Sequence, residues 1–252
     1  MSNPRKGFSE NFDLLLFEEV DGVCPKCTNP LIKEKNGRKV KVFEKAHIYP
    51  LNPTNEEEQL LKAEEKLSGD VNAYENLIAL CRPCHDMFDN GRTVEEYREM
   101  CNIKRDLLKQ GLSKRSWSEY PLENEIASII DQLANQTDEQ FVDNLEFDPK
   151  EVDKKTNATL KPLTKRKIKG DIQYFKFIQS KLKYVDSINP TSSDLIAQQI
   201  KSYYVKVGGI FSTQEEVYHE MTKWINKRSN SGSEQASSVI VSFFVQNCEV
   251  FK

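Results

Sequence analysis

Two pairs of cysteines place the strongest constraint on how this chain can fold. Cys24 and Cys27 form one C-x2-C pair, and Cys81 and Cys84 form a second. Four thiolates paired in this way suit a closed tetrahedral zinc site, which leaves no open coordination position for catalysis. In a reducing compartment such pairs are typical of metal ligands rather than of disulfides. The sequence therefore predicts a structural zinc ion that joins two distant segments.

Two histidines and an asparagine accompany the cysteines. His85 directly follows Cys84, so the second pair would hold its backbone while its side chain points elsewhere. Asn76 opens the apolar run that leads to Cys81, and His47 lies between the two pairs. Hydrolysis of a phosphodiester needs an activated water and a cation on the developing charge. An imidazole suits the first task because it titrates near neutral pH.

The order of these residues resembles that of the HNH nucleases, a family with a ββα-metal fold, in their zinc-knuckle variant. The resemblance rests on residues 45–50 (KAHIYP), 75–80 (ENLIAL) and 84–85 (CH), which follow one another as the family's H, N and H motifs do. It covers about residues 20–92. It implies a metal-dependent DNA endonuclease with a structural zinc ion.

The resemblance also implies a role for each candidate catalytic residue. His47 would be the general base and His85 a ligand of a catalytic Mg²⁺ or Mn²⁺ ion, while Asn76 would position the loop that carries His47 or approach the metal. Many HNH nucleases have an acid just before the first histidine, but this chain has Ala46 there. Asp89, one helical turn after His85, could complete the metal shell, although the same spacing also arises by chance on a helix surface. Two further carboxylates are weaker candidates, Asp86 and Glu44.

The charge of the chain bears on how it binds DNA. The net charge is −3, whereas a protein that holds DNA unaided usually has a basic excess, because phosphate contacts supply most non-specific affinity. A local basic cluster precedes His47, and it either contacts nucleic acid or is a solvated hairpin: Lys33, Lys35, Arg38, Lys39, Lys41 and Lys45. The overall charge suggests that another component brings the DNA.

Composition indicates where the chain works. No apolar run is long enough to span a membrane. Residues 1–20 lack the basic start, apolar centre and cleavage site of a signal peptide. We therefore expect a cytoplasmic protein with no membrane partner. Cys101 and Cys248, outside the two pairs, are expected to be small buried hydrophobic side chains.

Local patterns predict the elements around these motifs. Asn36-Gly37 lies between two strand-like flanks, which predicts a β-hairpin whose Val40 alternates toward the core. A polar helix with a solvated acidic face is expected over residues 56–67. A second helix, capped by Thr93 with Glu96, should follow the site.

The second half of the chain has the patterns of a helical domain. One helix is expected over residues 138–147, and another begins with a capping box formed by Ser212 and Glu215. Residues 148–161 are polar and charged, which is typical of a linker. The closing run, residues 239–251, is apolar on almost every side, so it should be buried in its domain or against a partner.

The end of the chain resembles the C-terminal domain of ABC-three-component anti-phage systems, the Lamassu-type group. The resemblance covers about the last 80 residues and rests mainly on residues 242–251 (SFFVQNCEVF). In that group the domain accompanies a variable effector, an ATPase of the structural-maintenance-of-chromosomes (SMC) type and an accessory subunit. It implies that residues 161–252 dock the chain onto such a complex.

These features predict an α+β protein. Residues 1–110 would form the ββα-metal HNH domain with its zinc, residues 111–160 a helical connector and linker, and residues 161–252 an all-helical docking domain. The predicted function is a metal-dependent HNH DNA endonuclease, the effector of an ATPase-coupled, SMC-like anti-phage complex. Two alternatives stay open: a stand-alone HNH restriction or toxin nuclease, and a non-catalytic zinc adaptor that bridges DNA and the ATPase. The sequence also leaves open whether the chain forms a homo-oligomer.

Overall fold

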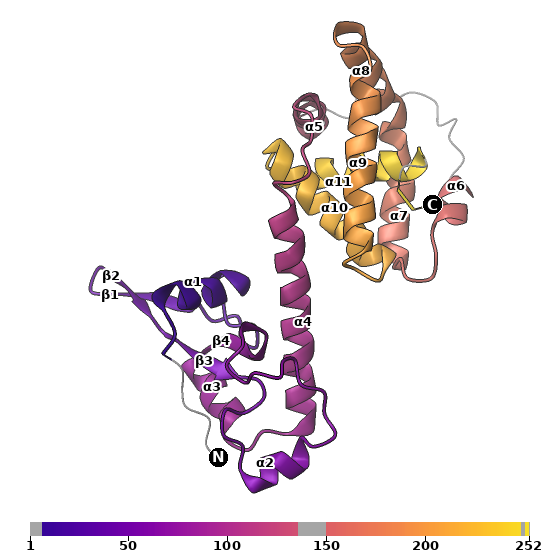
Figure 1. Cartoon of the computed structure of the whole chain (residues 1–252). Helices are drawn as coiled ribbons and strands as arrows, with labels where there is room; N and C mark the ends of the chain where they lie inside the picture. The colour runs from indigo at the N-terminus through magenta and orange to yellow at the C-terminus, as the bar shows by residue number, and fades with distance from the viewer. Residues whose placement is uncertain (1–6, 136–149, 248–249, 252) are drawn as a thin grey trace. The chain divides into compact units, whose positions relative to one another are not determined.

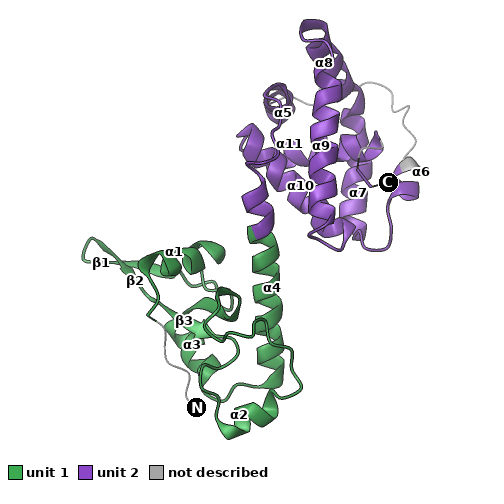
Figure 2. Ribbon diagram, viewed as in Figure 1, with its two compact units in different colours: residues 1–111 green, residues 112–252 purple. Residues whose placement is uncertain are grey.

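A computed structural model of the chain describes residues 7–135, 150–247 and 250–251. The chain forms two compact units, Met1–Gly111 and Leu112–Lys252 (Figure 2). The helix expected over residues 138–147 lies outside the described residues, as does Cys248. None of the helices in the described ranges combines the length and the apolar composition that a bilayer crossing requires.

The first unit combines helices with short strands (Figure 1). In chain order its elements are α1 (Glu10–Glu19), β1 (Ile32–Lys35), β2 (Arg38–Lys41), β3 (Phe43–His47), α2 (Asn55–Leu60), the 3₁₀ turn η1 (Tyr74–Asn76), β4 (Leu77–Cys81), α3 (Arg82–Asp89) and α4 (Val94–Ser116). The capping box expected before α4 is confirmed. The Glu96 amide donates to Thr93 Oγ1 at 3.1 Å, and the Thr93 amide donates to Glu96 Oε2 at 3.1 Å.

The centre of this unit is a strand–strand–helix arrangement. β3 and β4 pair antiparallel, with Phe43 opposite Cys81 and His47 opposite Leu77. Every residue of β4 is buried, and α3 begins directly after it. The order β3–β4–α3 is the ββα arrangement that the sequence predicted. Together with the helical second unit, it confirms the α+β fold class.

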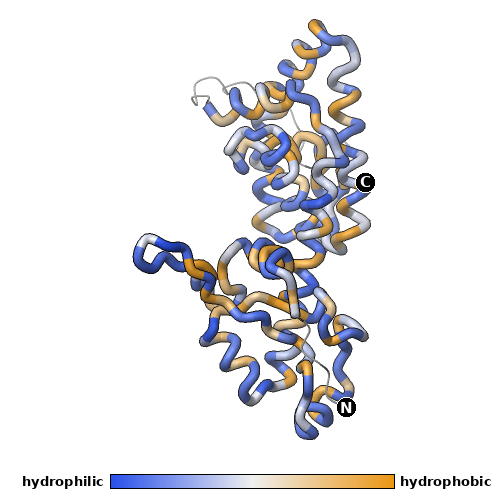
Figure 3. The backbone as a smooth tube through the Cα atoms, turned by 60° about the vertical axis from the view of Figure 1, so that its left-hand side comes forward, coloured by the Kyte–Doolittle hydropathy of each residue, from blue (hydrophilic) through white to orange (hydrophobic). Residues whose placement is uncertain are grey.

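β1 and β2 form a separate two-stranded ribbon. The turn residues Asn36 and Gly37 have left-handed φ values of 54° and 71°, which Asn-Gly adopts easily and which match the twist of a two-residue hairpin. Both strands are exposed along their whole length, and the ribbon is hydrophilic over most of it (Figure 3). The prediction that Val40 points into the core is wrong. Its side chain is 40% exposed, because neither face of the ribbon is covered by the core.

α2 is shorter than the polar helix expected over residues 56–67, because it ends at Leu60. The next residue, Leu61, is buried in the core of the unit. Glu64 then forms an ion pair with Arg98 of α4 at 2.7 Å. Packing of Leu61 and pairing of Glu64 thus end the helix early, and this part of the acidic face is not simply solvated.

The second unit is all-helical in the described residues. Its elements are α5 (Glu125–Asn135), α6 (Lys150–Lys155), α7 (Pro162–Asp171), the 3₁₀ turn η3 (Ile172–Tyr174), α8 (Phe175–Ile188), α9 (Ser192–Gly208), α10 (Gln214–Ser229) and α11 (Glu234–Gln246). All the residues of α11 from Ala236 to Val245 are buried, and so are Val250 and Phe251, which confirms the expected burial for the described apolar residues of the closing run. The core of this unit also includes apolar side chains of α5, so the unit takes in residues that were expected to form a connector.

Residues 148–161, expected to be a linker, contain α6. Val152 of this helix is fully buried. Lys155 Nζ donates hydrogen bonds to the carbonyl oxygens of Val245 (3.2 Å) and Gln246 (2.6 Å) at the end of α11. From Lys150 on, this polar segment therefore packs on the core through one apolar anchor and one well-placed cation, and is not an open linker.

The helix expected after Ser212 is α10, and its cap lies one residue later than expected. The capping box joins Thr213 and Glu216, with the Glu216 amide 3.2 Å from Thr213 Oγ1. Glu215, expected in that role, instead accepts a hydrogen bond from the Thr164 hydroxyl of α7 at 2.8 Å. Both pairs have capping-box spacing, and the contact with α7 decides which pair is used.

Candidate functional site

Four cysteines from two distant segments meet in the first unit. Their sulfur atoms all lie within 4.8 Å of one another: Cys24, Cys27, Cys81 and Cys84. A tetrahedral zinc site with Zn–S bonds of ~2.3 Å separates its sulfurs by about 3.8 Å, so the cluster has the size that such a site requires. Within the described residues, no other group of three or more His, Cys, Asp or Glu side chains could hold a metal ion.

Local structure sets the position of each cysteine pair. The Cys24 amide donates to the Asn29 carbonyl at 2.8 Å, and the Cys24 carbonyl accepts from the Thr28 amide at 2.8 Å, which folds the first pair into a tight loop. Cys81 ends β4 and precedes α3, so that Cys84 falls in the first helical turn. An ion held by all four sulfurs would therefore join the start of the ribbon segment to the β4–α3 junction.

The electrostatics of the thiols favour a bound cation. A backbone hydrogen bond from Asn29 lowers the pKa of the Cys27 thiol to about 7. Burial raises the pKa of the Cys81 and Cys84 thiols. One thiolate forms readily, but the cluster resists further negative charge unless a cation compensates it. A donor set of four sulfurs fits zinc, which binds thiolates in this geometry.

A cavity of about 360 Å³ brings together three of the other candidate residues, His47, His85 and Asp89. It is lined by Lys45, His47, Pro50, Leu51, Asn52, Glu57, His85, Asp89 and Arg92. Lys45 and His47 stand two residues apart on β3 and share one face, whereas Ala46 is fully buried on the other face, opposite Ile78. An acid at position 46 would thus face the core of this unit rather than the cavity.

The two histidines reach the cavity from different elements. His47 ends β3, and its Nε2 lies 3.5 Å from Asn72 Oδ1. His85 comes from α3, and its Nε2 lies 3.4 Å from Asp89 Oδ2. Two neighbouring ligands of an octahedral ion with bonds of ~2.1 Å are about 3 Å apart, so His85 and Asp89 fit one divalent cation. Asp86 Oδ1 lies 3.5 Å from His85 Nδ1. The His85 Nδ1 atom is buried and has no hydrogen-bond partner among the described residues.

Asn76 is buried beside the cavity and does not line it. Its Oδ1 accepts a hydrogen bond from the Tyr49 amide (2.8 Å). Its Nδ2 donates to the carbonyl oxygens of Tyr49 (2.9 Å) and Val71 (2.8 Å). The side chain therefore fixes the loop that follows His47. Of the two roles expected for Asn76, this geometry fits the positioning role.

Arg92 lines the cavity and was not singled out from the sequence. Its side chain is only 1% exposed, and it donates hydrogen bonds to Asp89 Oδ1 (3.0 Å) and to the His47 carbonyl (3.2 Å). Burial lowers the pKa of Arg92, while Asp89 and Glu57 favour its charged form. Arg92 thus connects the end of β3 to the end of α3. Its only signal in the sequence is the three-residue spacing from Asp89, which is too common to be specific.

Asp13 of α1 connects the ribbon to the cavity. Its carboxylate accepts hydrogen bonds from Lys45 (2.6 Å) and from Lys41 at the end of β2. Burial on its own would raise the pKa of Asp13, but the two lysines outweigh it and the pKa is lowered. The Asp13 carboxylate therefore binds both Lys41, at the base of the ribbon, and Lys45, which lines the cavity.

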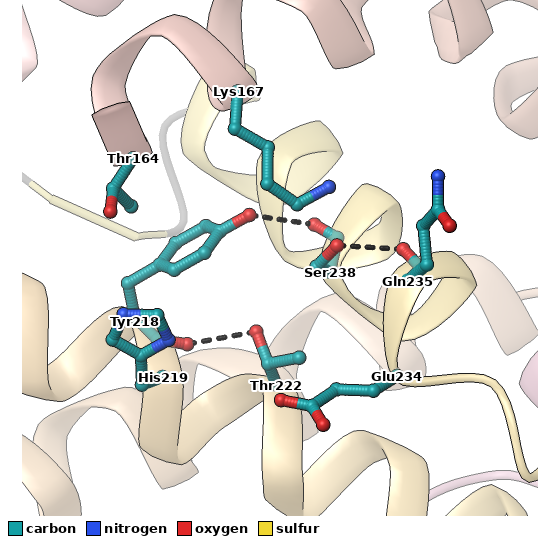
Figure 4. A pocket seen from close by; sticks show the side chains of 8 residues that line it. All are labelled: Thr164, Lys167, Tyr218, His219, Thr222, Glu234, Gln235 and Ser238. Atoms are coloured by element: carbon teal, nitrogen blue, oxygen red, sulfur yellow. Dashed lines mark hydrogen bonds between the residues drawn. The ribbon is translucent and has the colours of Figure 1, made fainter. Parts of the chain in front are cut away.

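A second cavity, of about 440 Å³, lies in the second unit and contains none of the candidate nuclease residues (Figure 4). Its hydroxyl groups bond within and between the helices that line it, and Thr164 of α7 donates to Glu215 of α10 (2.8 Å). Tyr218 donates to the Ser238 carbonyl (3.3 Å), and Thr222 donates to the Tyr218 carbonyl (2.9 Å). These groups serve the packing of α7, α10 and α11.

Two family models match the chain, and they divide it much as the two units do. The model described as "HNH endonuclease" matches residues 24–94, which contain the cysteine cluster, both histidines of the cavity and Asn76. The model for C-terminal domain 11 of the ABC-three component (ABC-3C) systems matches residues 113–251, more than half of the chain. No curated protein and no solved structure matches the chain. The chain belongs to the ABC-3C family defined by C-terminal domain 11, and it carries an HNH endonuclease domain ahead of that domain.

Proposed function

We propose that this protein is a metal-dependent DNA endonuclease and the effector subunit of an ABC-3C anti-phage complex in the cytoplasm. The observation that carries the proposal is the convergence of His47, His85 and Asp89 on one cavity. These residues come from β3 and α3 of the ββα arrangement, next to a four-cysteine cluster. A general base beside a site for a divalent cation is the arrangement that phosphodiester hydrolysis needs.

His47 is the general base of the proposed reaction. It accepts a proton from a water molecule, the water oxygen bonds to phosphorus, and the bond from phosphorus to the leaving sugar oxygen breaks. That oxygen then takes up a proton from solvent. A magnesium or manganese ion held by His85 and Asp89 would compensate the negative charge that develops on the phosphate.

Two residues hold this machinery in place. Asn76 fixes the loop after His47 through three hydrogen bonds to backbone groups. Arg92 contacts both Asp89 and the His47 carbonyl, so it sets the distance between the base and the proposed metal ligand. The zinc ion held by the four cysteines is structural, because a site closed by four thiolates offers no position for substrate.

The second unit is the proposed connection to the rest of the complex. The ABC-3C match over residues 113–251 supports docking onto partner subunits. We infer an SMC-like ATPase and an accessory subunit as those partners. The net charge of −3 supports a division of labour in which the partners bring DNA to a nuclease that binds it weakly alone.

The decisive test compares histidine variants of the full chain in a plasmid-cleavage assay with magnesium or manganese. His47→Ala should reduce cleavage about 100- to 10,000-fold, the usual contribution of a general base, while zinc content and folding stay unchanged. The matched control is His219→Ala, because His219 is the chain's remaining histidine and its side chain is 51% exposed on α10. Cleavage by His47→Ala at the wild-type rate would refute the assignment of the base. No cleavage by the wild-type protein, alone or with its partners, would favour the non-catalytic adaptor.

A further inference from the structure

The two faces of the β1–β2 ribbon differ in charge. The antiparallel register sets Lys33 opposite Val40 and Lys35 opposite Arg38. Side chains opposite each other lie on the same face and alternate along each strand. One face, called here the basic face, therefore carries Lys33, Lys35, Arg38 and Val40. The other face carries Ile32, Glu34, Lys39 and Lys41.

The cations of the two faces have different partners. On the second face, Lys39 lies opposite Glu34, and Lys41 binds Asp13 of α1. On the basic face, no ion pair or side-chain hydrogen bond within the described part of the chain involves its three cations: Lys33, Lys35 and Arg38. The ribbon thus gathers three uncompensated positive charges on one exposed surface.

This arrangement works against the stability of the isolated hairpin. Lys35 and Arg38 are directly opposed and flank the turn, and like charges in that relation repel each other. A hairpin that served only as a solvated connection would gain from an acid at one of these positions. A bound polyanion would remove the repulsion, which is why the charge pattern indicates a ligand rather than solvent alone.

The ribbon is also close to the candidate cavity along the chain and in space. β2 ends at Lys41, and β3, which ends at His47, begins after one intervening residue. Lys41 binds the same Asp13 carboxylate as Lys45, which lines the cavity. At ~3.3 Å per extended residue, Arg38 lies at most about 30 Å from His47. This reach corresponds to about nine base pairs of duplex DNA.

We propose that the basic face of the ribbon binds the phosphate backbone of duplex DNA, within about nine base pairs of the phosphate that is cut. The placement relative to the cut rests on the proposed nuclease function, whereas binding itself does not. Each of Lys33, Lys35 and Arg38 neutralises one phosphate, so the contact is independent of base sequence. A two-stranded ribbon is narrow enough to enter a major groove ~12 Å wide.

The test measures binding of the full chain to a fluorescent DNA duplex over a range of salt concentrations, without added divalent ions. The test variant is Lys33→Gln/Lys35→Gln/Arg38→Gln. Each phosphate contact contributes about 0.9 to the slope of log K against log salt, so the slope of this variant should be shallower by about 2.7. The matched control is Lys62→Gln/Lys183→Gln/Arg228→Gln. It removes the same net charge from exposed positions elsewhere and should keep the wild-type slope.

Two further measurements exclude a trivial loss of structure. The glutamine variant of the ribbon should melt at a temperature no lower than the wild type, because the repulsion between Lys35 and Arg38 is gone. The variant Lys33→Arg/Lys35→Arg/Arg38→Lys keeps every charge and should restore the wild-type slope. If this charge-preserving variant binds as weakly as the glutamine variant, phosphate neutralisation is not the mechanism and the proposal fails.

The outcomes separate this proposal from the proposed function. A glutamine variant with the wild-type slope overturns the ribbon assignment, whatever the cleavage assay gives. So does a wild-type protein that does not bind duplex DNA at low salt, or that binds duplex RNA more tightly than DNA. A wild-type protein with a ribbon-dependent slope but no cleavage supports the ribbon and refutes the nuclease. If both hold, trimming the duplex on the side that meets the ribbon should leave cleavage unchanged beyond about nine base pairs and reduce it at some point inside that distance.

Discussion

Asn76 shows how much one side chain can do at the scale of a residue. It satisfies three backbone groups on two loops, and it is almost completely buried. Asn76→Ala leaves these groups without partners in a dry environment, at about 1–3 kcal/mol for each group that water cannot reach. We expect the free energy of unfolding to fall by about 2–4 kcal/mol in chemical denaturation, because part of the loss will be relieved by relaxation.

A control for this variant is Asn90→Ala, which removes one exposed hydrogen bond, to the Asp86 carbonyl at 2.7 Å. It should cost under about 1 kcal/mol. If Asn76→Ala is no more destabilising than this control, Asn76 does not fix the loop and its role must lie elsewhere. Asn76→Ala should also lose cleavage at temperatures where it is still folded, since the loop it holds follows directly after the proposed base.

The residues of the site differ in how well the sequence could predict them. His47, His85 and Asp89 belong to patterns with chemical meaning, and the structure places all three at one cavity. Arg92 has no such pattern. Its buried position depends on contacts with residues far away in the chain, including the His47 carbonyl. Many HNH nucleases have an acid at the position of Ala46. Strand alternation turns this side chain into the core, where an acid would be buried, which is a physical reason for an apolar residue here.

At the scale of secondary-structure elements, the β4–α3 junction supplies two of the four cysteines, so zinc binding and the folding of this junction should be coupled. Cys81→Ser should abolish zinc binding, because it removes one of four sulfurs that surround a single point. Structural zinc contributes on the order of 10 kcal/mol of apparent binding free energy, as much as the whole stability of many domains. We therefore expect the variant to lose its zinc in elemental analysis and to unfold over residues 20–110.

Cys101→Ser is the matched control for the zinc prediction. Cys101 is buried in α4 and lies outside the cysteine cluster. The Cys101→Ser variant should keep one zinc ion per chain. Its free energy of unfolding should fall only by the cost of a buried polar substitution, about 1–3 kcal/mol. Wild-type protein that cleaves DNA and contains no zinc would contradict the structural role of the cluster.

Elements with strong local signals were predictable, and elements decided by packing were not. The Asn-Gly turn of the ribbon and the capping box of α4 were correct because their physics is local. The early end of α2 and the existence of α6 depend on Leu61 and Val152, single side chains that reach a core the sequence cannot display. The cap of α10 was misplaced by one residue because Glu215 bonds to Thr164, a partner distant in sequence.

At the scale of the whole molecule, the division into two units suggests where partner binding should be lost. A chain that ends at residue 117 keeps α4 complete and removes the rest of the second unit. It should retain zinc and the fold of the first unit, but should no longer co-purify with the proposed partner ATPase. The control is full-length His47→Ala, which should still co-purify. Co-purification of the shortened chain as strong as that of the full chain would place docking in the first unit.

α4 bears on where this chain can be cut or joined to another domain. It runs without interruption from Val94 to Ser116, so the boundary at Gly111 lies inside a helix rather than in a loop (Figure 2). A protease finds no ready cleavage point there, since a helix must open locally before it is cut. Recombination that joined a different effector to this C-terminal domain would have to deliver a helix at its end, because a loop would break the backbone hydrogen bonds on both sides of Gly111. A replacement domain that ends in a helix continuous with α4 would keep these hydrogen bonds intact.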